Sequence, residues 1–175
     1  CLPEITSLTA DNNGICEYDT ITFSTSYIQG DGLLDDWILY FGDGNSTLQL
    51  RDTNFIAYVY DTCGGLFTAT YIISDVNNCS DTDLVSFNVY CPPSINQASA
   101  IVENVCLGGA SAFTAAIDTG TSSIITNILN WGDSTPTITY PFDTLSMLHH
   151  TYEDSGTYVI TLIVTDTSGC TDTSE

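Results

Sequence analysis

Apolar and polar residues alternate along much of the chain, and the longest run of alternation lies near its C-terminal end. Over residues 158–165 every second position is apolar, and the apolar set is Tyr158, Ile160, Leu162 and Val164. A period of two is the pattern of a strand that packs on a core with one face. Gly156 precedes the run and Gly169 follows it, and glycine interrupts regular structure. We therefore predict a turn followed by one long strand over residues 157–165.

Similar runs predict short strands along the whole chain, and no stretch has the 3.6-residue period of a helix. In the first half we expect strands near residues 3–9, 19–26, 35–41, 46–51, 54–60, 66–74 and 84–90. In the second half we expect them near residues 94–103, 110–117, 124–131, 136–140, 146–152 and 157–165. Clusters of Gly, Asn and Asp lie between these runs, which is typical of turns. The pattern therefore predicts an all-β protein.

The two halves of the chain repeat one another. Cys1 and Cys16 match Cys91 and Cys106 at the same separation, and Gly65, Asp75 and Cys79 match Gly156, Asp166 and Cys170. The repeat is about 90 residues long, which is a plausible size for one small sandwich domain. The stiff segment Cys91-Pro92-Pro93 marks the junction. We therefore predict one domain over residues 1–90 and a second over residues 91–175.

Two motifs resemble those of a known family. One is H-x-Y-x-x-x-G-x-Y running into an alternating strand that ends in D-x-x-G, here His150, Tyr152, Gly156, Tyr158, Asp166 and Gly169. The other is similar to W-x-F-G-D-G; it is represented by Trp37 with Gly42, Asp43 and Gly44, and by the weaker copy Trp131, Gly132 and Asp133. Together they resemble PKD (polycystic kidney disease) domains, which are small immunoglobulin-like sandwiches of bacterial and archaeal extracellular surface proteins.

The resemblance implies two tandem immunoglobulin-like (PKD-type) β-sandwiches. Trp37 would then be the core tryptophan of the third strand, F-G-D-G a hairpin turn, and His150 a structural histidine. By the repeat, Glu175 matches Leu84, so the strand equivalent to Ser86–Tyr90 is missing from the second copy. Two explanations stay open: the chain is longer, or a neighbouring molecule supplies the strand.

The resemblance also implies a pairing of the seven cysteines. The start of the first strand and the loop before the last strand lie at one end of such a sandwich, so Cys1 should pair with Cys79 and Cys91 with Cys170. Cys16 should pair with Cys63 at the other end. Cys106 has no partner in the second copy, so we expect it to be unpaired or to form an intermolecular bond. Disulfides rather than a metal cluster indicate an extracellular or cell-surface protein.

The charge of the chain restricts its partners. The chain contains 22 acidic residues and a single Lys or Arg, Arg51, which gives a formal net charge of −21. A protein with one cation cannot neutralise phosphates, so nucleic acid is excluded as a partner. An anionic membrane surface is excluded for the same reason, and the chain has no run of 18 apolar residues that would insert into a membrane.

The search for chemistry in the sequence finds little. His149 and His150 are the only histidines, and a site with Asp154 and Ser155 has no nucleophile motif to support it. We therefore expect no catalysis and no cofactor, with Ca²⁺ as the one candidate ligand. The weak candidate ligands are carboxylates in probable loops, namely Asp35, Asp36, Asp81 and Asp83. The stronger interpretation is that these side chains are simply exposed to solvent and bind no ion.

Several polar residues are candidates for glycosylation. Asn45 and Asn78 begin N-x-S/T sequons on predicted turns, and Thr20 and Thr144 lie in Asp-Thr-aliphatic triplets typical of bacterial O-glycosylation. Surface glycans are also candidate binding partners. Polysaccharide binders need rows of exposed aromatic rings, so an exposed row of tyrosines would support this interpretation. The candidates for such a row are Tyr58, Tyr60, Tyr71 and Tyr90.

Two functions agree with these features. The first is a non-catalytic structural module of an extracellular fibre, filament or long adhesin, whose partners are copies of itself or neighbouring domains of a longer chain. Strand complementation and disulfides would then join the subunits. The alternative is a spacer or substrate-binding accessory module of a secreted hydrolase, which PKD-like domains also form.

Overall fold

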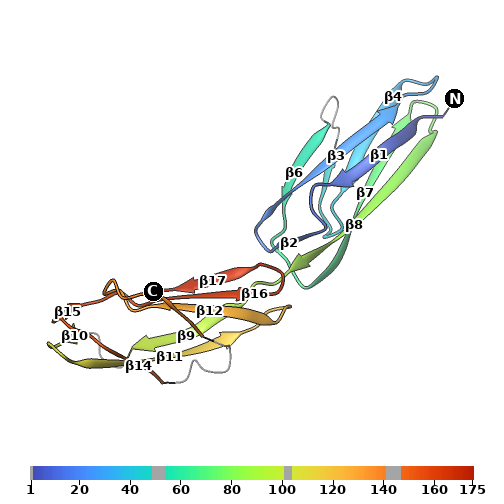
Figure 1. Ribbon diagram of the computed structural model, residues 1–175. Coiled ribbons are helices and arrows are strands. Elements are labelled where there is room, and N and C mark those ends of the chain that lie inside the picture. The colour runs from blue at the N-terminus through green and yellow to red at the C-terminus, as the bar shows by residue number, and fades with distance from the viewer. Residues whose placement is uncertain (1, 49–53, 101–103, 141–146) are drawn as a thin grey trace. The chain divides into compact units, whose positions relative to one another are not determined.

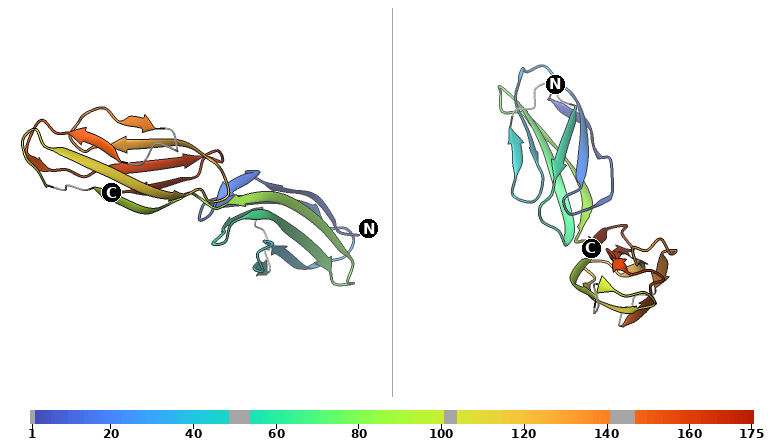
Figure 2. Two further views of the ribbon diagram at one scale, coloured as in Figure 1. Left: turned by 90° about the horizontal axis from the view of Figure 1, so that it is seen from below. Right: turned by 90° about the vertical axis from the view of Figure 1, so that its left-hand side faces the viewer.

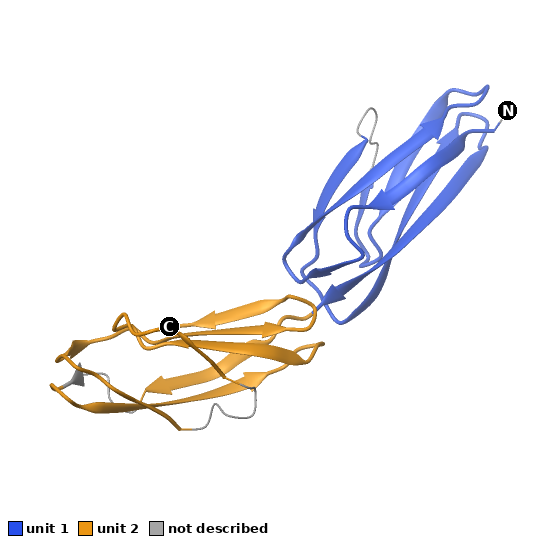
Figure 3. Ribbon diagram, in the orientation of Figure 1, with its two compact units in different colours: residues 1–90 blue, residues 91–175 orange. Residues whose placement is uncertain are grey.

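The computed structural model describes residues 2–48, 54–100, 104–140 and 147–175, and these form two compact units, 1–90 and 91–175 (Figure 3). The described residues contain strands and turns and no helix. Consequently no helix among them is available to cross a membrane. Each unit is an immunoglobulin-like β-sandwich, with two facing layers of strands that are visible from several directions (Figures 1 and 2).

The first unit is built from a three-stranded and a five-stranded sheet. The smaller sheet has the order β1 (Glu4–Ala10), β3 (Thr20–Ile28), β6 (Phe55–Val59). The larger has the order β2 (Gly14–Cys16), β8 (Ser80–Tyr90), β7 (Gly65–Asp75), β4 (Leu34–Tyr40), β5 (Ser46–Leu48). All of these pairs are antiparallel except β2 with β8, which is parallel.

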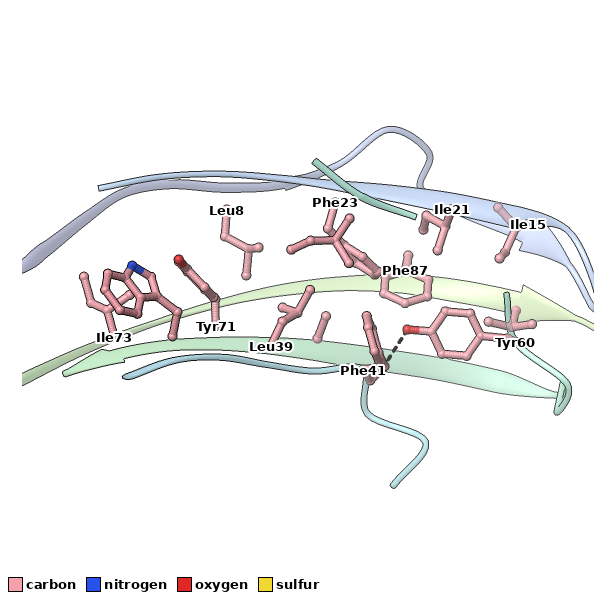
Figure 4. Close-up of a cluster of buried hydrophobic side chains, with 14 of the residues drawn as sticks. Leu8, Ile15, Ile21, Phe23, Leu39, Phe41, Tyr60, Tyr71, Ile73 and Phe87 are labelled. Atoms are coloured by element: carbon pink, nitrogen blue, oxygen red, sulfur yellow. Dashed lines mark hydrogen bonds between the residues drawn. The ribbon is translucent and has the colours of Figure 1, made fainter. Parts of the chain in front are cut away.

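The core of the first unit lies between its two sheets (Figure 4). The apolar positions of the alternating runs point inward, and side chains such as Ile21, Phe23, Leu39 and Phe87 are almost fully buried. Trp37 is also buried, as the family resemblance implied. Burial of these side chains removes apolar surface from water, which is the main force that holds the sheets together.

The second unit repeats this plan, except that two short strands pair with each other apart from its two sheets. A three-stranded sheet has the order β14 (Leu148–Thr151), β11 (Ala110–Asp118), β9 (Ser94–Ala100). A four-stranded sheet has the order β13 (Ile138–Tyr140), β12 (Ile124–Asn130), β16 (Thr161–Asp166), β17 (Thr171–Ser174). The remaining strands, β10 (Asn104–Val105) and β15 (Gly156–Thr157), pair only with each other.

The strand predicted over residues 157–165 is wrong as a single element. It is divided into β15 and β16, and residues 158–160 between them belong to no strand. In the first unit the equivalent strand β7 is continuous, because β8 pairs with it from Gly65 to Ser74. In the second unit β17 pairs only with Leu162–Thr165 of β16. The strand is interrupted where it has no neighbour to bond with.

Two other details differ from the prediction. The last strand of the first unit begins at Ser80 rather than near residue 84, and its equivalent β17 is present over Thr171–Ser174. The second unit therefore contains the beginning of its last strand, and no described residue takes the place of Ser86–Tyr90.

Candidate functional site

The repeated Gly-Asp turn after β4 and β12 requires glycine for two reasons. Gly42 and Gly132 have φ angles of +87° and +79°, which side chains with a Cβ disfavour. In addition, a Cβ at Gly42 would lie 2.5 Å from the carbonyl oxygen of Thr68, and one at Gly132 would lie 2.3 Å from that of Val159. The turn can therefore pack directly against the backbone of the neighbouring segment.

In the first unit, the aspartate of this turn binds an aromatic residue. The Tyr58 hydroxyl donates to Asp43 Oδ2 at 2.6 Å, and Asn45 donates from its backbone N–H to Oδ1 at 2.9 Å and from its side chain to Oδ2 at 3.1 Å. The Tyr58 ring stacks on Phe41 with ring centroids 3.7 Å apart. Partial burial acts to raise the pKa of Asp43, but the hydrogen bonds outweigh it and lower that pKa.

In the second unit, histidine replaces the tyrosine. His150 Nε2 lies 2.6 Å from Asp133 Oδ2, and Thr135 donates from its hydroxyl to Asp133 Oδ1 at 2.6 Å. The His150 ring stacks on Trp131 at 4.8 Å. Burial opposes ionisation of Asp133, yet these bonds lower its pKa to about 2. His150 is thus held between the Asp133 carboxylate and the Trp131 ring.

A buried tyrosine closes the same end of each unit. The Tyr60 hydroxyl donates to the Phe41 carbonyl at 2.8 Å, and that of Tyr152 donates to the Trp131 carbonyl at 3.0 Å. Trp131 therefore takes the place of Phe41, rather than that of Trp37 as its similarity to the W-x-F-G-D-G motif would suggest. Four residues upstream, the position that matches Trp37 is occupied by the buried Asn127.

Two aspartates in each unit hold a loop and a strand, and these roles are not among those predicted above. Asp75 Oδ1 accepts from the backbone N–H groups of Asn77 and Cys79, each at 2.9 Å, and Asp166 binds Ser168 and Cys170 in the same way. Asp81 and Asp172 accept from Ile5 N–H and Ile95 N–H, each at 2.7 Å. The repeated spacing D-x-x-x-C-x-D was the signal for them.

The candidate calcium ligands do not form a site in the described part of the chain. Asp35 and Asp36 are exposed on β4, whereas Asp81 and Asp83 lie on β8 and accept backbone hydrogen bonds. Within the described ranges, no three metal-binding side chains lie close enough to hold an ion.

The cysteines fall into two groups. Cys16, Cys63, Cys91 and Cys170 are disulfide-bonded, and these are the four cysteines of the expected pairs Cys16–Cys63 and Cys91–Cys170. Cys79 and the exposed Cys106 carry free thiols. The free thiol of Cys79 differs from the expected bond to Cys1; because Cys1 lies outside the described residues, that bond stays a prediction.

The candidate glycosylation sites that are described lie on the surface. Asn45, Asn78 and Thr20 are exposed, although the Asn45 side chain also donates to Tyr58 at 2.8 Å. Thr144 lies outside the described residues. The four candidate tyrosines do not form an exposed row, because Tyr60 and Tyr71 are buried in the core and Tyr58 stacks on Phe41.

An open groove in the second unit distinguishes it from the first. It is a cavity of about 340 Å³ within this unit, and its lining side chains include Ala98, Phe113, Tyr152, Tyr158, Ile160 and Glu175. In the first unit the ring of Phe87 occupies the equivalent space. Its centroid lies 5.6 Å from that of Phe23, 5.3 Å from that of Tyr60 and 6.5 Å from that of Phe67, which match Phe113, Tyr152 and Tyr158.

Comparison with known proteins gives one family match. Residues 92–175 match the family model described as PKD domain. Among solved structures, the PKD1 domain of Vibrio anguillarum Epp is 16% identical and covers 53% of this chain and 98% of its own, with a TM-score of 0.41. The PKD1 domain of the Vibrio cholerae metalloprotease PrtV is 18% identical and covers 51% and 98%, with a TM-score of 0.40.

Fibronectin(III)-like modules of Clostridium thermocellum CbhA are similar over more of the chain. They are 10% identical and cover 95% of this chain and 91% of their own, with a TM-score of 0.41. No curated protein matches the chain.

Proposed function

Because residues 92–175 match the PKD domain family model, we propose that the chain is a non-catalytic structural module of an extracellular surface fibre, filament or long adhesin. In this role the two sandwiches act as consecutive units of a load-bearing scaffold. Their partners are copies of the same chain or neighbouring domains.

The observation that carries this proposal is the kind of interaction that the two units share. The Tyr60–Phe41, Asp75–Cys79 and Asp81–Ile5 hydrogen bonds recur in the second unit as Tyr152–Trp131, Asp166–Cys170 and Asp172–Ile95. Each of them ties a loop or strand end to the sandwich. The interactions that the two units share therefore stabilise the fold itself. This supports a module with a mechanical role.

The cysteines and the charge support an extracellular setting. Disulfides persist in oxidising compartments, and four cysteines of this chain are disulfide-bonded. A net charge of −21 keeps such a surface soluble and self-repelling at low ionic strength, and salt or divalent cations screen the repulsion.

The exposed thiol of Cys106 is the proposed covalent link between neighbouring subunits. Strand complementation at the second unit is the proposed non-covalent link. On a non-reducing gel the native chain should run partly as a disulfide-linked species, and Cys106→Ser should abolish that species. Persistence of the linked species in the variant would exclude Cys106 as the link.

Negative-stain electron microscopy of native, unreduced material tests the fibre role. Uniform filaments with an axial repeat near the length of one or two sandwiches are the expected result. Single short rods, or rods attached to a globular head, would contradict it. That second result would favour the alternative role, a spacer or accessory module of a secreted hydrolase.

A further inference from the structure

Strand β6 forms one edge of the smaller sheet of the first unit, and it carries apolar side chains toward solvent (Figure 1). Phe55 and Val59 are 69% and 46% exposed, and Ala57 between them is exposed as well. We propose that β6 is a self-pairing edge, through which two copies of the chain join their three-stranded sheets across a two-fold axis. This inference rests on the proposed function, in which copies of the chain associate, and it names one contact between them.

The other edge strands in the described ranges have features that oppose pairing. β1 and β9 each contain a register shift, and a carboxylate of Asp81 or Asp172 accepts a main-chain N–H from each of them. The remaining edge strands are β2, β5, β10, β13, β14, β15 and β17, and each has only two to four residues. Bulges, short length and inward-pointing charges are the means by which natural sheets keep their edges from associating.

Strand β6 has none of these features. Its five residues pair with β3 without a register shift. The run over residues 54–60, NFIAYVY, contains no charge and no proline, although the whole chain has 22 acidic residues. A regular, uncharged edge strand with exposed apolar side chains is a template for pairing with another strand.

The main-chain groups of alternate residues in β6 point to the open edge. The carbonyls of Asn54 and Tyr60, which flank the strand, accept N–H groups from β3 and the turn before it, at 3.1 and 2.9 Å. Main-chain groups alternate between the two sides of an antiparallel strand, so those of Phe55, Ala57 and Val59 face away from β3. No described residue bonds to them. Each of the three therefore offers one donor and one acceptor to a neighbouring strand.

Antiparallel pairing of two β6 strands centred on Ala57 satisfies these groups and also matches the side chains. In this register Phe55 of each copy lies opposite Val59 of the other, and an aromatic residue opposite a β-branched one is a favourable cross-strand pair. Ala57 lies opposite its own equivalent on the two-fold axis. The contact is the same from both sides and closes after two copies, so it pairs subunits without extending a fibre by itself.

The charge distribution favours a second copy as the occupant. The β3 residues beside β6 on the outer face are Thr20, Thr22 and Ser24, so this surface offers no carboxylate to a basic partner. A neutral strand with apolar residues at alternate positions fits it, and β6 is such a strand. Each copy carries a net charge of −21, so the two copies also repel each other until salt screens the charges.

The contact should be weak. A pair of five-residue strands is smaller than the interfaces of roughly 1,200–2,000 Å² that hold stable complexes together. We therefore expect a reversible dimer that increases with protein concentration and with salt.

Sedimentation velocity of the 175-residue chain tests the dimer, in a Cys106→Ser background that removes the exposed thiol. The dimer fraction should rise with protein concentration, and it should rise as salt increases from about 0.01 M to 0.15 M. Hydrogen exchange with residue resolution should show slower exchange at the amides of Phe55, Ala57 and Val59 as the dimer forms.

A matched pair of variants tests the place of the contact. Ala57→Lys should weaken the dimer at least about tenfold, because two lysines would lie opposite each other on the axis. Thr151→Lys adds the same charge to an exposed residue of β14, the equivalent strand of the second unit. This control lowers the net negative charge as well, so it should associate at least as well as the parent chain. Unfolding temperatures verify that both variants are folded.

A mixing experiment tests the register. Phe55→Lys and Val59→Glu each remove one member of both cross-strand pairs, so each variant alone should be mainly monomeric. Mixed in equal amounts, they should form a heterodimer, because the introduced lysine then lies opposite the introduced glutamate. Absence of the heterodimer would overturn the register centred on Ala57.

Three other results would overturn the proposal. The first is a chain that stays monomeric at every concentration and salt. The second is a dimer that Ala57→Lys does not weaken, or that leaves exchange at the three β6 amides unchanged. The third is slow exchange of these amides in the monomer, which would show that the edge is already covered within one chain.

The failure of this inference differs from the failure of the fibre role. Filaments in native material, together with a parent chain that forms no β6 dimer, would overturn the edge contact alone. A β6 dimer together with isolated rods in native material would overturn the fibre role alone.

Discussion

Gly42 and Gly44 provide a matched pair, because both have strongly positive φ angles, +87° and +99°, but only Gly42 contacts a neighbouring backbone. Gly44→Ala should cost about 1–2 kcal/mol from its backbone conformation alone. Gly42→Ala should cost about 1–3 kcal/mol more, because its Cβ would meet the Thr68 carbonyl at 2.5 Å. Unfolding in urea measures both free energies, and equal losses would show that the Thr68 contact is unimportant.

Asp133 should make the stability of the second unit depend on pH in the acidic range. Its folded-state pKa, about 2, lies below its ordinary value of 3.8, so the ionised carboxylate stabilises the fold above pH 3.8. That contribution is lost as the pH falls from about 3.8 to 2. Urea midpoints between pH 2 and 6 should show this decline, and Asp133→Asn should reduce it. An unchanged pH profile in the variant would contradict the role of this carboxylate.

At the residue scale, the sequence motifs indicate positions with a fixed backbone conformation or a buried ring. In the structure Gly42 has a positive φ, Trp37 is buried, and His150 contacts Asp133. The roles of Asp75 and Asp81 were missed, because a carboxylate that caps a distant N–H looks like any other loop acid in the sequence. Only the fold brings Asp81 to Ile5, 76 residues away.

At the scale of the element, β12 carries a polar residue in a core position. Asn127 is fully buried, and its Oδ1 has no hydrogen-bond partner among the residues that the structure describes. Burial of an unsatisfied carbonyl is unfavourable by about 1–3 kcal/mol. Asn127→Val should therefore stabilise the second unit, measured as a higher urea midpoint. A lower midpoint would show that the amide makes an important interaction.

The interruption between β15 and β16 makes a prediction about exchange. Amide protons of residues 158–160 should exchange with solvent faster than those of Phe67–Ala69, because only the latter lie beside a full-length partner strand. Hydrogen exchange with residue resolution compares the two segments in one sample. Equal protection would show that another segment covers residues 158–160 in solution.

The strands whose predicted bounds were wrong or that were not predicted share one physical cause. The first residues of β8, Ser80–Asp83, and all of β17 are polar or charged, so they show no apolar alternation. Their strand conformation comes from pairing with β7 and β16 and from the Asp81 and Asp172 hydrogen bonds. Tertiary neighbours therefore decided these elements, whereas alternation was sufficient for the core strands.

At the scale of the whole molecule, the two units should differ in stability. The first has a filled core that includes Phe87 and Val89, while the second has an open groove and the buried Asn127. Calorimetry should resolve two transitions. Asn127→Val should raise only the lower one, and Gly42→Ala should lower only the higher one. A single transition that both variants shift would show that the units unfold together.

The pairing of β10 has a consequence for local unfolding. In the first unit β8 lies between β2 and β7, whereas β10, the equivalent of β2, bonds directly to β15 at Asn104–Thr157 and Val105–Gly156. The β10–β15 pair is two residues long and belongs to neither large sheet of the second unit. This end of the second unit should therefore open locally before the sheets unfold.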